Sequence, residues 1–239
     1  MGTAHTGNGM KRLVLFDVDG TLLAAGGTGK RAIHDAMMQV YGETGDIDGY
    51  RMGGRTDPQI ARELLTGAGW AVDDVLERLP ALWAAYVCNL RREVAGGEVR
   101  ALRGIPALLE RIEAEGGETV LGLLTGNLVE GAQLKVDAAG LGFARFRVGA
   151  YGSDHWVRAE LPAVALRRAR DATGLGFAGK EVVIVGDTPH DVSCGEHLGV
   201  RTIATATGRH SVDELAACGP DHVFADLSDA DAVWEAIAA

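Results

Sequence analysis

The segment LVLFDVDGTLL (residues 13–23) joins a short apolar run to two carboxylates, a glycine and a threonine. Residues 13–16 have the length and composition of a buried strand. Asp17 and Asp19 then follow with a single residue between them. Because two anions that close raise each other's pKa, the pair needs solvent or a cation beside it. The segment therefore predicts a strand that ends in a solvated or metal-binding carboxylate pair.

Five further apolar runs of strand length follow along the chain, and helix-like patterns alternate with them. The runs cover residues 119–125, 146–152, 181–187, 201–207 and 222–226. Near-continuous apolar strands that alternate with helices predict an α/β fold, in which a Rossmann-like parallel sheet core carries helices on both faces. Ligands bind such sheets beyond the carboxyl ends of the strands. Polar residues at the ends of the runs are therefore candidates for a functional site.

Residues 28–98 interrupt this alternation, because they contain helical patterns only. No strand pattern of comparable strength appears between Phe16 and Thr119. The segment is too long for one crossover connection, which favours an all-helical cap inserted after the first strand over helices that merely cover the sheet. We therefore predict a flexible tail at residues 1–9, an α/β core at residues 10–27 and 99–239, and a helical cap at residues 28–98.

Bulk composition limits the classes of partner. The chain has 239 residues, of which 47% are hydrophobic and 23% charged, and a net charge of −10. This charge argues against nucleic-acid or anionic-membrane binding, because both need clustered Lys and Arg. No apolar run approaches the length of a membrane span. Three separated cysteines without a C-x-x-C pair indicate a reducing, cytoplasmic environment. The oligomeric state stays unknown.

Polar side chains close two of the later apolar runs. Thr125 and Asn127 close one run, and Asp187 and Asp191 follow another. Each residue alone has an ordinary explanation, since Asp favours turns and helix N-caps, and a Thr or Asn can stand at a strand end or cap a helix. Because parallel strands end at one edge of a sheet, these residues would join the first carboxylate pair. Such a cluster of polar side chains favours a functional site over separate turn and capping roles.

With these motifs the sequence resembles the haloacid dehalogenase-like hydrolase superfamily, and within it the phosphoglycolate-phosphatase-like branch with a helical cap. The family's first motif, D-x-D-G-T, matches residues 17–21. The second motif, a Thr that ends an apolar strand, matches Thr125, and the fourth, G-D-x-x-x-D, matches residues 186–191. Their order and spacing match, and the similarity spans nearly the whole chain from Lys11 onward.

The resemblance implies roles for the residues of the first two motifs. Asp17 would be the nucleophile and would form an aspartyl-phosphate intermediate. Asp19 would protonate the leaving oxygen and then activate water as a general base. The residues that would contact the phosphoryl group or the substrate are Gly20, Thr125, Gly126 and Asn127.

The resemblance also implies a Mg²⁺ ion. Asp17, Asp187 and the backbone carbonyl of Asp19 would hold it together with waters, an oxygen-only shell that suits a hard cation. Asp191 would bond the metal waters or orient its neighbours from outside that shell. A divalent cation between the carboxylates removes their repulsion and lets one of them attack a phosphoryl centre.

The third motif departs from the family pattern. Most relatives carry a Lys there, whereas the corresponding stretch GSDHWVRAELPAVAL (residues 152–166) has none. If Pro162 opens the following helix, Arg158 is the basic residue nearest the expected place. Arg can bridge oxyanions as Lys does, although with a different reach. The alternative is a solvated Arg that precedes a helix.

One loop of the predicted cap is a candidate for substrate recognition. MGGRTDPQI (residues 52–60) resembles the specificity loop of the family. Gly53 and Gly54 allow a close approach of the backbone, and Arg55 would meet an anionic end of the substrate. An exposed, structural Arg is the alternative.

Taken together, the motifs predict a Mg²⁺-dependent phosphomonoester hydrolase of a small phosphorylated metabolite. Asp19 and Asp187 argue against a metal-free dehalogenase. A phosphosugar mutase uses the same residues and stays open as an alternative. A catalytically silent binding protein also stays open, because it would account for the missing Lys.

Overall fold

A six-stranded parallel sheet forms the centre of the protein. The computed structural model describes residues 11–115 and 119–239, so the tail predicted at residues 1–9 lies outside the described residues. The spatial order of the strands is β5-β4-β1-β6-β7-β8. The strands are β1 (Arg12–Phe16), β4 (Thr119–Thr125), β5 (Val148–Tyr151), β6 (Val182–Gly186), β7 (Arg201–Thr205) and β8 (His222–Phe224). The predicted α/β fold class is confirmed, and each predicted run contains a strand.

The position of β1 in the sheet sets where its carboxylates emerge. Phe16, its last residue, pairs with Leu123 of β4 and with Val185 of β6. Residues 13–16 are fully buried, as expected for a strand that is covered on both faces. Because the three strands are parallel and in this register, Asp17 emerges at the same edge of the sheet as the residues that end β4 and β6.

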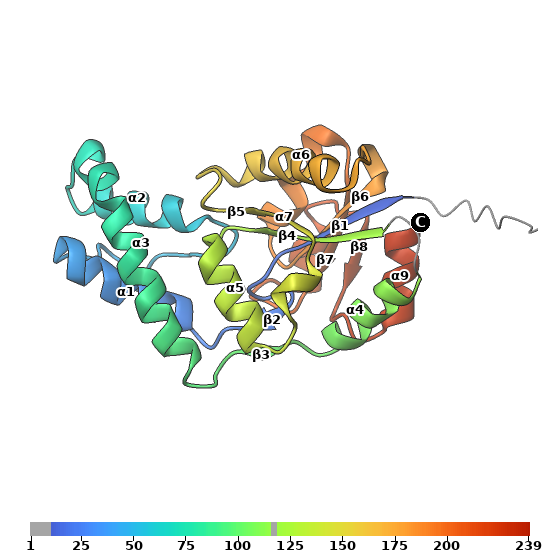
Figure 1. Cartoon of the computed structure of the whole chain (residues 1–239), viewed down its shortest axis with the longest axis horizontal. Coiled ribbons are helices and arrows are strands. Elements are labelled where there is room, and N and C mark those ends of the chain that lie inside the picture. Colours follow the sequence, from blue (N-terminus) through green and yellow to red (C-terminus); the bar gives the residue numbers. More distant parts are fainter. Residues whose placement is uncertain (1–10, 116–118) are drawn as a thin grey trace, which may run out of the picture.

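Helices cover both faces of the sheet, and alternate residues of β1 pack against opposite sets of helices. Leu13 and Leu15 share a hydrophobic cluster with α6. Val14 and Phe16 share another cluster with α4, α5 and α9. In Figure 1, α6 lies on one side of the sheet, and α4 and α9 lie on the other. The elements are α4 (Ile105–Ala114), α5 (Val129–Ala138), α6 (Leu161–Thr173), α7 (Pro189–Ser193), α8 (Val212–Ala216), α9 (Ala230–Ala238) and the 3₁₀ helices η1 (Phe143–Arg145), η2 (Arg158–Glu160), η3 (Gly179–Glu181) and η4 (Glu196–Leu198).

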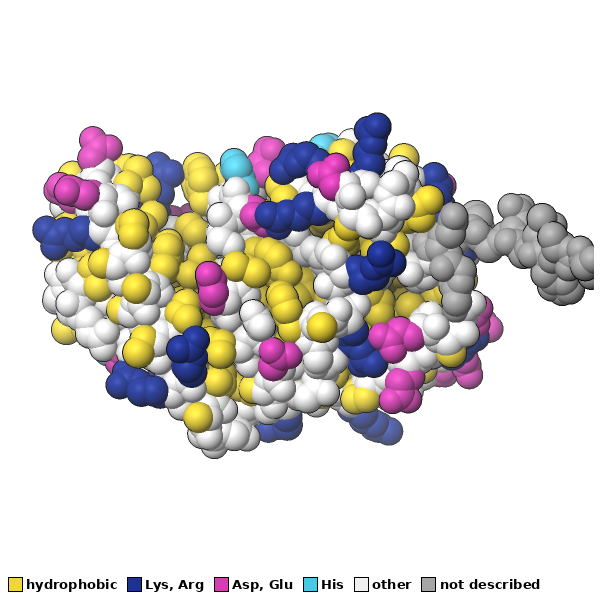
Figure 2. Space-filling model, in the orientation of Figure 1, with side chains coloured by type: hydrophobic (Ala, Val, Ile, Leu, Met, Phe, Trp, Pro, Cys, Tyr) yellow, Lys and Arg dark blue, Asp and Glu magenta, His cyan; other side chains and the backbone are white. Residues whose placement is uncertain are grey.

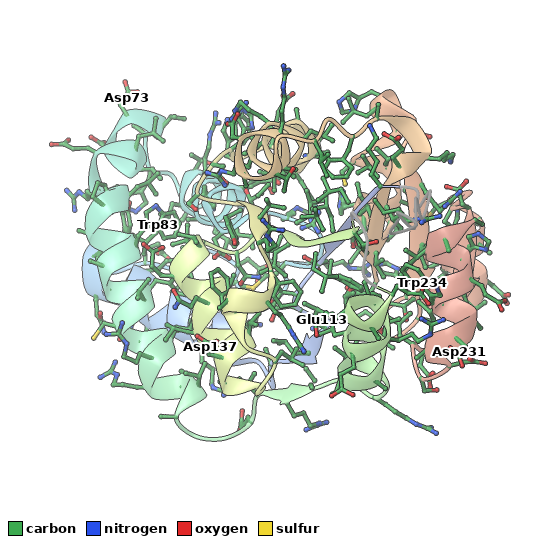
Figure 3. All side chains as sticks on the ribbon, turned by 45° about the vertical axis from the view of Figure 1, so that its right-hand side comes forward. Asp73, Trp83, Glu113, Asp137, Asp231 and Trp234 are labelled. Atoms are coloured by element: carbon green, nitrogen blue, oxygen red, sulfur yellow. The ribbon has the colours of Figure 1, made fainter. Side chains whose placement is uncertain are left out.

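An ion pair and a ring contact join α4 to α9. The Arg111 Nε of α4 lies 2.8 Å from Asp231 Oδ1, and its guanidinium lies 5.6 Å from the centroid of the Trp234 ring. Figure 3 labels Asp231 and Trp234 on α9, beside α4. This pair of helices covers the sheet near the C-terminus (Figure 1).

Three helices form a lobe beside the sheet, on the left in Figure 1. The helical lobe consists of α1 (Thr28–Tyr41), α2 (Asp57–Gly67) and α3 (Val72–Val94). It has a hydrophobic cluster of its own, in which Met37, Leu65 and Leu82 are fully buried and which Leu128 joins from the loop before α5. The bounds 28–98 predicted for a separate cap domain stay a prediction.

Two short strands lie on either side of the lobe in the sequence. β2 (Leu23–Ala24) and β3 (Arg100–Ala101) pair antiparallel, with Leu23 opposite Ala101. Neither strand approaches β1 in length, so the expectation of no comparable strand between Phe16 and Thr119 is not contradicted, but the ribbon itself was not predicted. Strands of two residues are too short to leave a periodic pattern in the sequence. The ribbon brings the two chain segments that lead into and out of the lobe side by side.

The surface carries charges of both signs. On the face shown in Figure 2, acidic and basic side chains are interspersed among apolar ones. Within residues 11–115 and 119–239, none of the helices combines the length and the apolar character that a membrane crossing requires.

Candidate active site

Asp17 lies at the end of the central strand, where backbone and side-chain contacts hold it. Its backbone N–H donates to the Val185 carbonyl at 2.9 Å, which continues the β1–β6 ladder by one residue. Its side chain is buried, and Oδ1 lies 3.1 Å from an Arg158 nitrogen. Burial, together with the charges of Asp191 and Asp19, raises the pKa of Asp17 to about 6 although Arg158 opposes this shift. The carboxylate is therefore deprived of water and only partly neutralised.

Asp187 follows β6 and is the second buried carboxylate of the site. Thr21 donates a hydrogen bond of 3.1 Å to its Oδ1. Burial, and then the charges of Asp17 and Asp191, raise the pKa of Asp187 to about 8. Gly208 packs so closely that a Cβ there would collide with the Asp187 carboxylate, and the same holds for Gly20, whose φ is +89°. The predicted substrate-binding residue Gly20 thus lies directly against Asp187.

Asp191 lies in the first turn of α7, and both of its oxygens have partners. Oδ1 pairs with Arg158. Oδ2 accepts from the Thr188 hydroxyl at 2.7 Å and from the Thr188 backbone N–H at 3.0 Å. This arrangement is a reciprocal cap of the helix start, because the Thr188 hydroxyl also accepts from the Asp191 N–H. Asp191 therefore anchors Arg158 to the sheet edge.

Arg158 stands at the start of η2 and connects two of the carboxylates. It is 6% exposed and contacts both Asp17 and Asp191. Burial alone would lower the pKa of Arg158, but the Asp191 and Asp17 carboxylates raise it overall, so the guanidinium is charged. Arg158 is therefore buried against the Asp17 carboxylate and not in solvent, and its part in the reaction stays a prediction.

The three carboxylates of this region could hold a metal ion. Oxygens of Asp17, Asp187 and Asp191 all lie within 4.8 Å of one another. Arg158 is the one cation in contact with them among the described residues. Burial first, and then the neighbouring carboxylates, raise the pKa values of Asp17 and Asp187. A set of carboxylate oxygens suits a hard divalent cation.

Asp19 lies in a second polar group, the Lys135 network, which consists of Asp19, Thr125, Asn127 and Lys135. The Asp19 Oδ2 accepts from Lys135 Nζ at 2.7 Å and from Asn127 Nδ2 at 2.7 Å. Lys135 also donates to Asn127 Oδ1 at 2.6 Å. Asn127 Nδ2 lies 2.8 Å from the Thr125 hydroxyl. The structure thus joins the predicted residues Asp19, Asn127 and Thr125 in one network.

Lys135 is the residue of this network that motif reasoning missed. It is 4% exposed and lies on α5, ten positions after Thr125 of the second motif but outside that motif. A signal was nevertheless present, because Ala132, Lys135 and Val136 fall on one face at helical spacing, and that face is buried. A Lys at such a position is rarely buried without a partner.

The start of α2 lies directly against the loop that follows β4. The Asp57 N–H donates to the Gly126 carbonyl at 2.8 Å, and the Leu128 N–H donates to Asp57 Oδ2 at 2.9 Å. A Cβ on Gly126 would collide with the Arg55 carbonyl, so only a glycine allows this approach. Burial raises the pKa of Asp57 to about 6, against the attraction of Lys135. Motif reasoning also missed Asp57, although an Asp before a Pro is a common start of a helix.

The Arg55 side chain has its contacts with the loop between α1 and α2 and with α2 itself. Its guanidinium bonds the Arg51 carbonyl, its Nε lies 3.6 Å from Glu63, and its Cζ lies 5.2 Å from the centroid of the Tyr50 ring. These contacts do not bring it to the carboxylates. The contact of Arg55 with an anionic substrate stays a prediction.

Comparison with known proteins gives both a family and a set of similar folds. A family model described as haloacid dehalogenase-like hydrolase matches residues 14–196. Comparison with curated protein sequences gives no match.

Similar solved structures include a hydrolase from Pseudomonas syringae, which is 19% identical with a TM-score of 0.70 and covers 96% of this chain and 100% of its own. A predicted phosphoglycolate phosphatase from Haemophilus somnus is 18% identical with a TM-score of 0.66 and covers 95% of this chain and 100% of its own. A Bacteroides vulgatus protein assigned as a β-phosphoglucomutase is 20% identical with a TM-score of 0.67 and covers 96% of this chain and 90% of its own. At these identities the likeness is one of fold. Since the family match covers most of the sequence, the chain belongs to the haloacid dehalogenase-like hydrolase family.

Proposed function

We propose that the protein is a Mg²⁺-dependent phosphomonoester hydrolase that acts on a small phosphate ester through an aspartyl-phosphate intermediate. The observation that carries this proposal is the place of Asp17. It is a buried carboxylate at the end of the central strand, 3.1 Å from Arg158, with a further carboxylate of Asp187 beside it. With Arg158 and a bound metal ion to offset the excess of negative charge, this carboxylate could attack a phosphoryl group.

In the proposed reaction, Asp17 and Asp19 divide the chemistry. An Asp17 oxygen attacks phosphorus and Asp19 donates a proton to the leaving oxygen, which departs as an alcohol. Asp19 then accepts a proton from water as that water attacks the aspartyl phosphate, which releases phosphate and restores Asp17. Thr125, the Gly126 amide and Arg158 would donate to the phosphoryl oxygens, and Gly20 and Asn127 would line the same site.

Asp17, Asp187 and the Asp19 backbone carbonyl would hold the Mg²⁺. When bound, the ion would neutralise charge on the carboxylates and on the phosphoryl group. Asp191 is proposed to stay outside the metal shell, which is supported by the engagement of its two oxygens with Arg158 and Thr188.

The helical lobe is proposed to act as a cap that keeps bulk water from the site. The bonds of Asp57 to Gly126 and Leu128 support this role, because they join the lobe to the loop that follows β4. The free thiols of Cys88, Cys194 and Cys218 support a reducing, cytoplasmic setting.

A phosphosugar mutase is the second candidate. The structural likeness to the Bacteroides vulgatus protein assigned as a β-phosphoglucomutase favours it. A mutase returns the phosphoryl group to a sugar hydroxyl, whereas a hydrolase transfers it to water. Release of inorganic phosphate therefore separates the two functions.

The test is phosphate release from 4-nitrophenyl phosphate and from a panel of metabolite phosphates, which includes phosphoglycolate and sugar 1-phosphates. Each substrate is measured with Mg²⁺ and with EDTA, for the wild type and for Asp17→Asn. We expect turnover that requires Mg²⁺ and is lost in the variant, and an acid-quenched phosphoenzyme with the label on Asp17. Sugar phosphate isomerisation without phosphate release would establish the mutase, and no turnover of any ester would refute both.

A further inference from the structure

Lys135 is buried at a cost that its surroundings must offset. Its side chain is 5% exposed, on the inner face of α5. Removing an ammonium group from water is unfavourable unless well-placed partners compensate it. Here the partners are the Asp19 carboxylate at 2.7 Å and the Asn127 amide oxygen at 2.6 Å.

The three side chains form a closed triangle. Lys135 and Asn127 both donate to the same oxygen of Asp19, and Lys135 also donates to Asn127. Two donors on one oxygen fix the rotation of the carboxylate, because any other rotamer of Asp19 would break both bonds. The Asp19 side chain is nevertheless 38% exposed. The carboxylate is therefore held by two donors and yet stays partly accessible.

The network also links Asp19 to the end of β4. Asn127 Nδ2 lies 2.8 Å from the Thr125 hydroxyl, at the end of β4. The lobe confines the ammonium from the other side, since a Cβ added to Gly29 of α1 would lie 3.2 Å from Lys135 Nζ. Lys135 is thus packed between the sheet edge and the lobe, with little freedom to move.

We infer that Lys135 is a positioning residue for the proposed hydrolase, which orients the Asp19 carboxylate toward the leaving-group oxygen. This inference rests on the proposed function. The positive charge of Lys135 is taken up by Asp19, so its role is to hold the acid and not to bind an anionic substrate. Its loss should impair proton donation to the leaving group more than it impairs substrate binding.

The experiment compares two substrates that differ in their need for a proton. 4-Nitrophenolate leaves without protonation, whereas an alkoxide leaves only when a general acid protonates it. We compare kcat/KM for 4-nitrophenyl phosphate with kcat/KM for a primary alkyl phosphate that the wild type accepts, because this quantity covers the steps up to departure of the leaving group. The variants are Lys135→Met, which keeps the apolar stem, and Lys135→Arg, which keeps the charge. Lys180→Met is the matched control, since Lys180 is half exposed and pairs with Asp221 away from the site.

For Lys135→Met we expect kcat/KM to fall about 100-fold with the alkyl phosphate and less than about threefold with 4-nitrophenyl phosphate, within the range that general acid catalysis contributes. KM for the alkyl phosphate should stay nearly constant, Lys135→Arg should recover part of the loss, and Lys180→Met should match the wild type. Equal losses with the two substrates, or no loss, would overturn the assignment while leaving the phosphatase in place. A wild type without turnover of either ester would instead refute the proposed function, and this inference with it.

A second variant covers the case in which Lys135→Met does not fold. Gly29→Ala keeps the ammonium but presses a methyl group against it, and α1 tolerates Ala better than Gly. We expect a smaller loss, about fivefold, again confined to the alkyl phosphate. A folded Gly29→Ala protein with wild-type rates on both substrates would count against the placement of Lys135.

Discussion

Two buried cations stand on either side of the proposed reaction centre, and their surroundings differ in charge. Arg158 contacts Asp17 and Asp191, and the carboxylate of Asp187 lies within 4.8 Å of these two. One cation thus faces three anions. Burial raises the pKa of Asp17 to about 6 and that of Asp187 to about 8, and the neighbouring carboxylates add to both shifts.

The Lys135 network carries a smaller excess of negative charge, since its ammonium bonds the Asp19 carboxylate and attracts that of the buried Asp57. Its ammonium bonds one carboxylate, that of Asp19, and the neutral amide of Asn127. The Arg158 side needs further positive charge, as a metal ion and a phosphoryl transfer site would require, whereas the Lys135 side already holds its carboxylate in place.

Removal of the nucleophile tests the Arg158 side most directly. We expect Asp17→Asn to lower kcat by about 10⁴-fold or more, because no other carboxylate can form the intermediate. The variant should stay folded, since the amide replaces a buried carboxylate whose ionisation is disfavoured. Phosphate release and circular dichroism measure the two effects, and a variant with more than a tenth of wild-type turnover, roughly, would exclude Asp17 as the nucleophile.

Substitution of Arg158 tests whether this cation compensates the carboxylates. Arg158→Ala leaves Asp17 and Asp191 buried without their partner, so we expect a loss of about 3–5 kcal/mol in the free energy of unfolding. kcat should fall about 100-fold or more, as the phosphoryl group loses a donor. Arg158→Lys should retain part of the stability and part of the turnover. Urea unfolding and steady-state kinetics give the values, and unchanged turnover in Arg158→Ala would show that the missing motif Lys has no substitute there.

Mg²⁺ binding should strengthen as the pH rises, because the raised pKa values keep Asp17 and Asp187 protonated at lower pH. Because the pKa values of Asp17 and Asp187 in the folded protein exceed the ordinary aspartate value of 3.8, these groups favour the fold when protonated and disfavour it as pH rises through about 6 and about 8. Mg²⁺ binds the ionised form. At about 100 times Kd it should raise stability by about 2–3 kcal/mol, and the Tm shift should be larger above about pH 8 than at about pH 5.

Asp187→Asn is the control for that measurement, as it removes a proposed ligand and one of the titrating groups. Thermal unfolding of the wild type and of this variant, with Mg²⁺ and with EDTA at both pH values, gives the comparison. An equal Tm shift in both proteins would mean that the ion binds elsewhere.

The smallest effect is expected from Arg55, which lies outside both regions. Its contacts are with Glu63 of α2 and with Tyr50 of the loop between α1 and α2, so Arg55→Ala should change kcat/KM less than about threefold for acidic and neutral phosphate esters alike. A rise in KM confined to acidic esters would instead support the substrate contact predicted from the loop sequence.

The sheet and most of the candidate site follow from local patterns in the sequence. Strand-length apolar runs marked β1, β4 and β6, and the register of parallel strands placed the residues after them at one edge. For this reason Asp17, Asp187 and Thr125 could be located without coordinates. Arg158 was predicted because the stretch that corresponds to the third motif has no Lys, and Arg158 is the basic residue nearest the expected position.

Other features were decided by the tertiary structure alone. Lys135 and Asp19 are separated by 116 positions in the sequence, and no period or motif connects them. The docking of Asp57 on the loop after β4 depends in the same way on how the lobe packs against the sheet. Local patterns report backbone geometry and which face is buried, because these depend on neighbouring residues. Which buried charges meet depends on packing between distant elements, and that is determined only when the whole chain has folded.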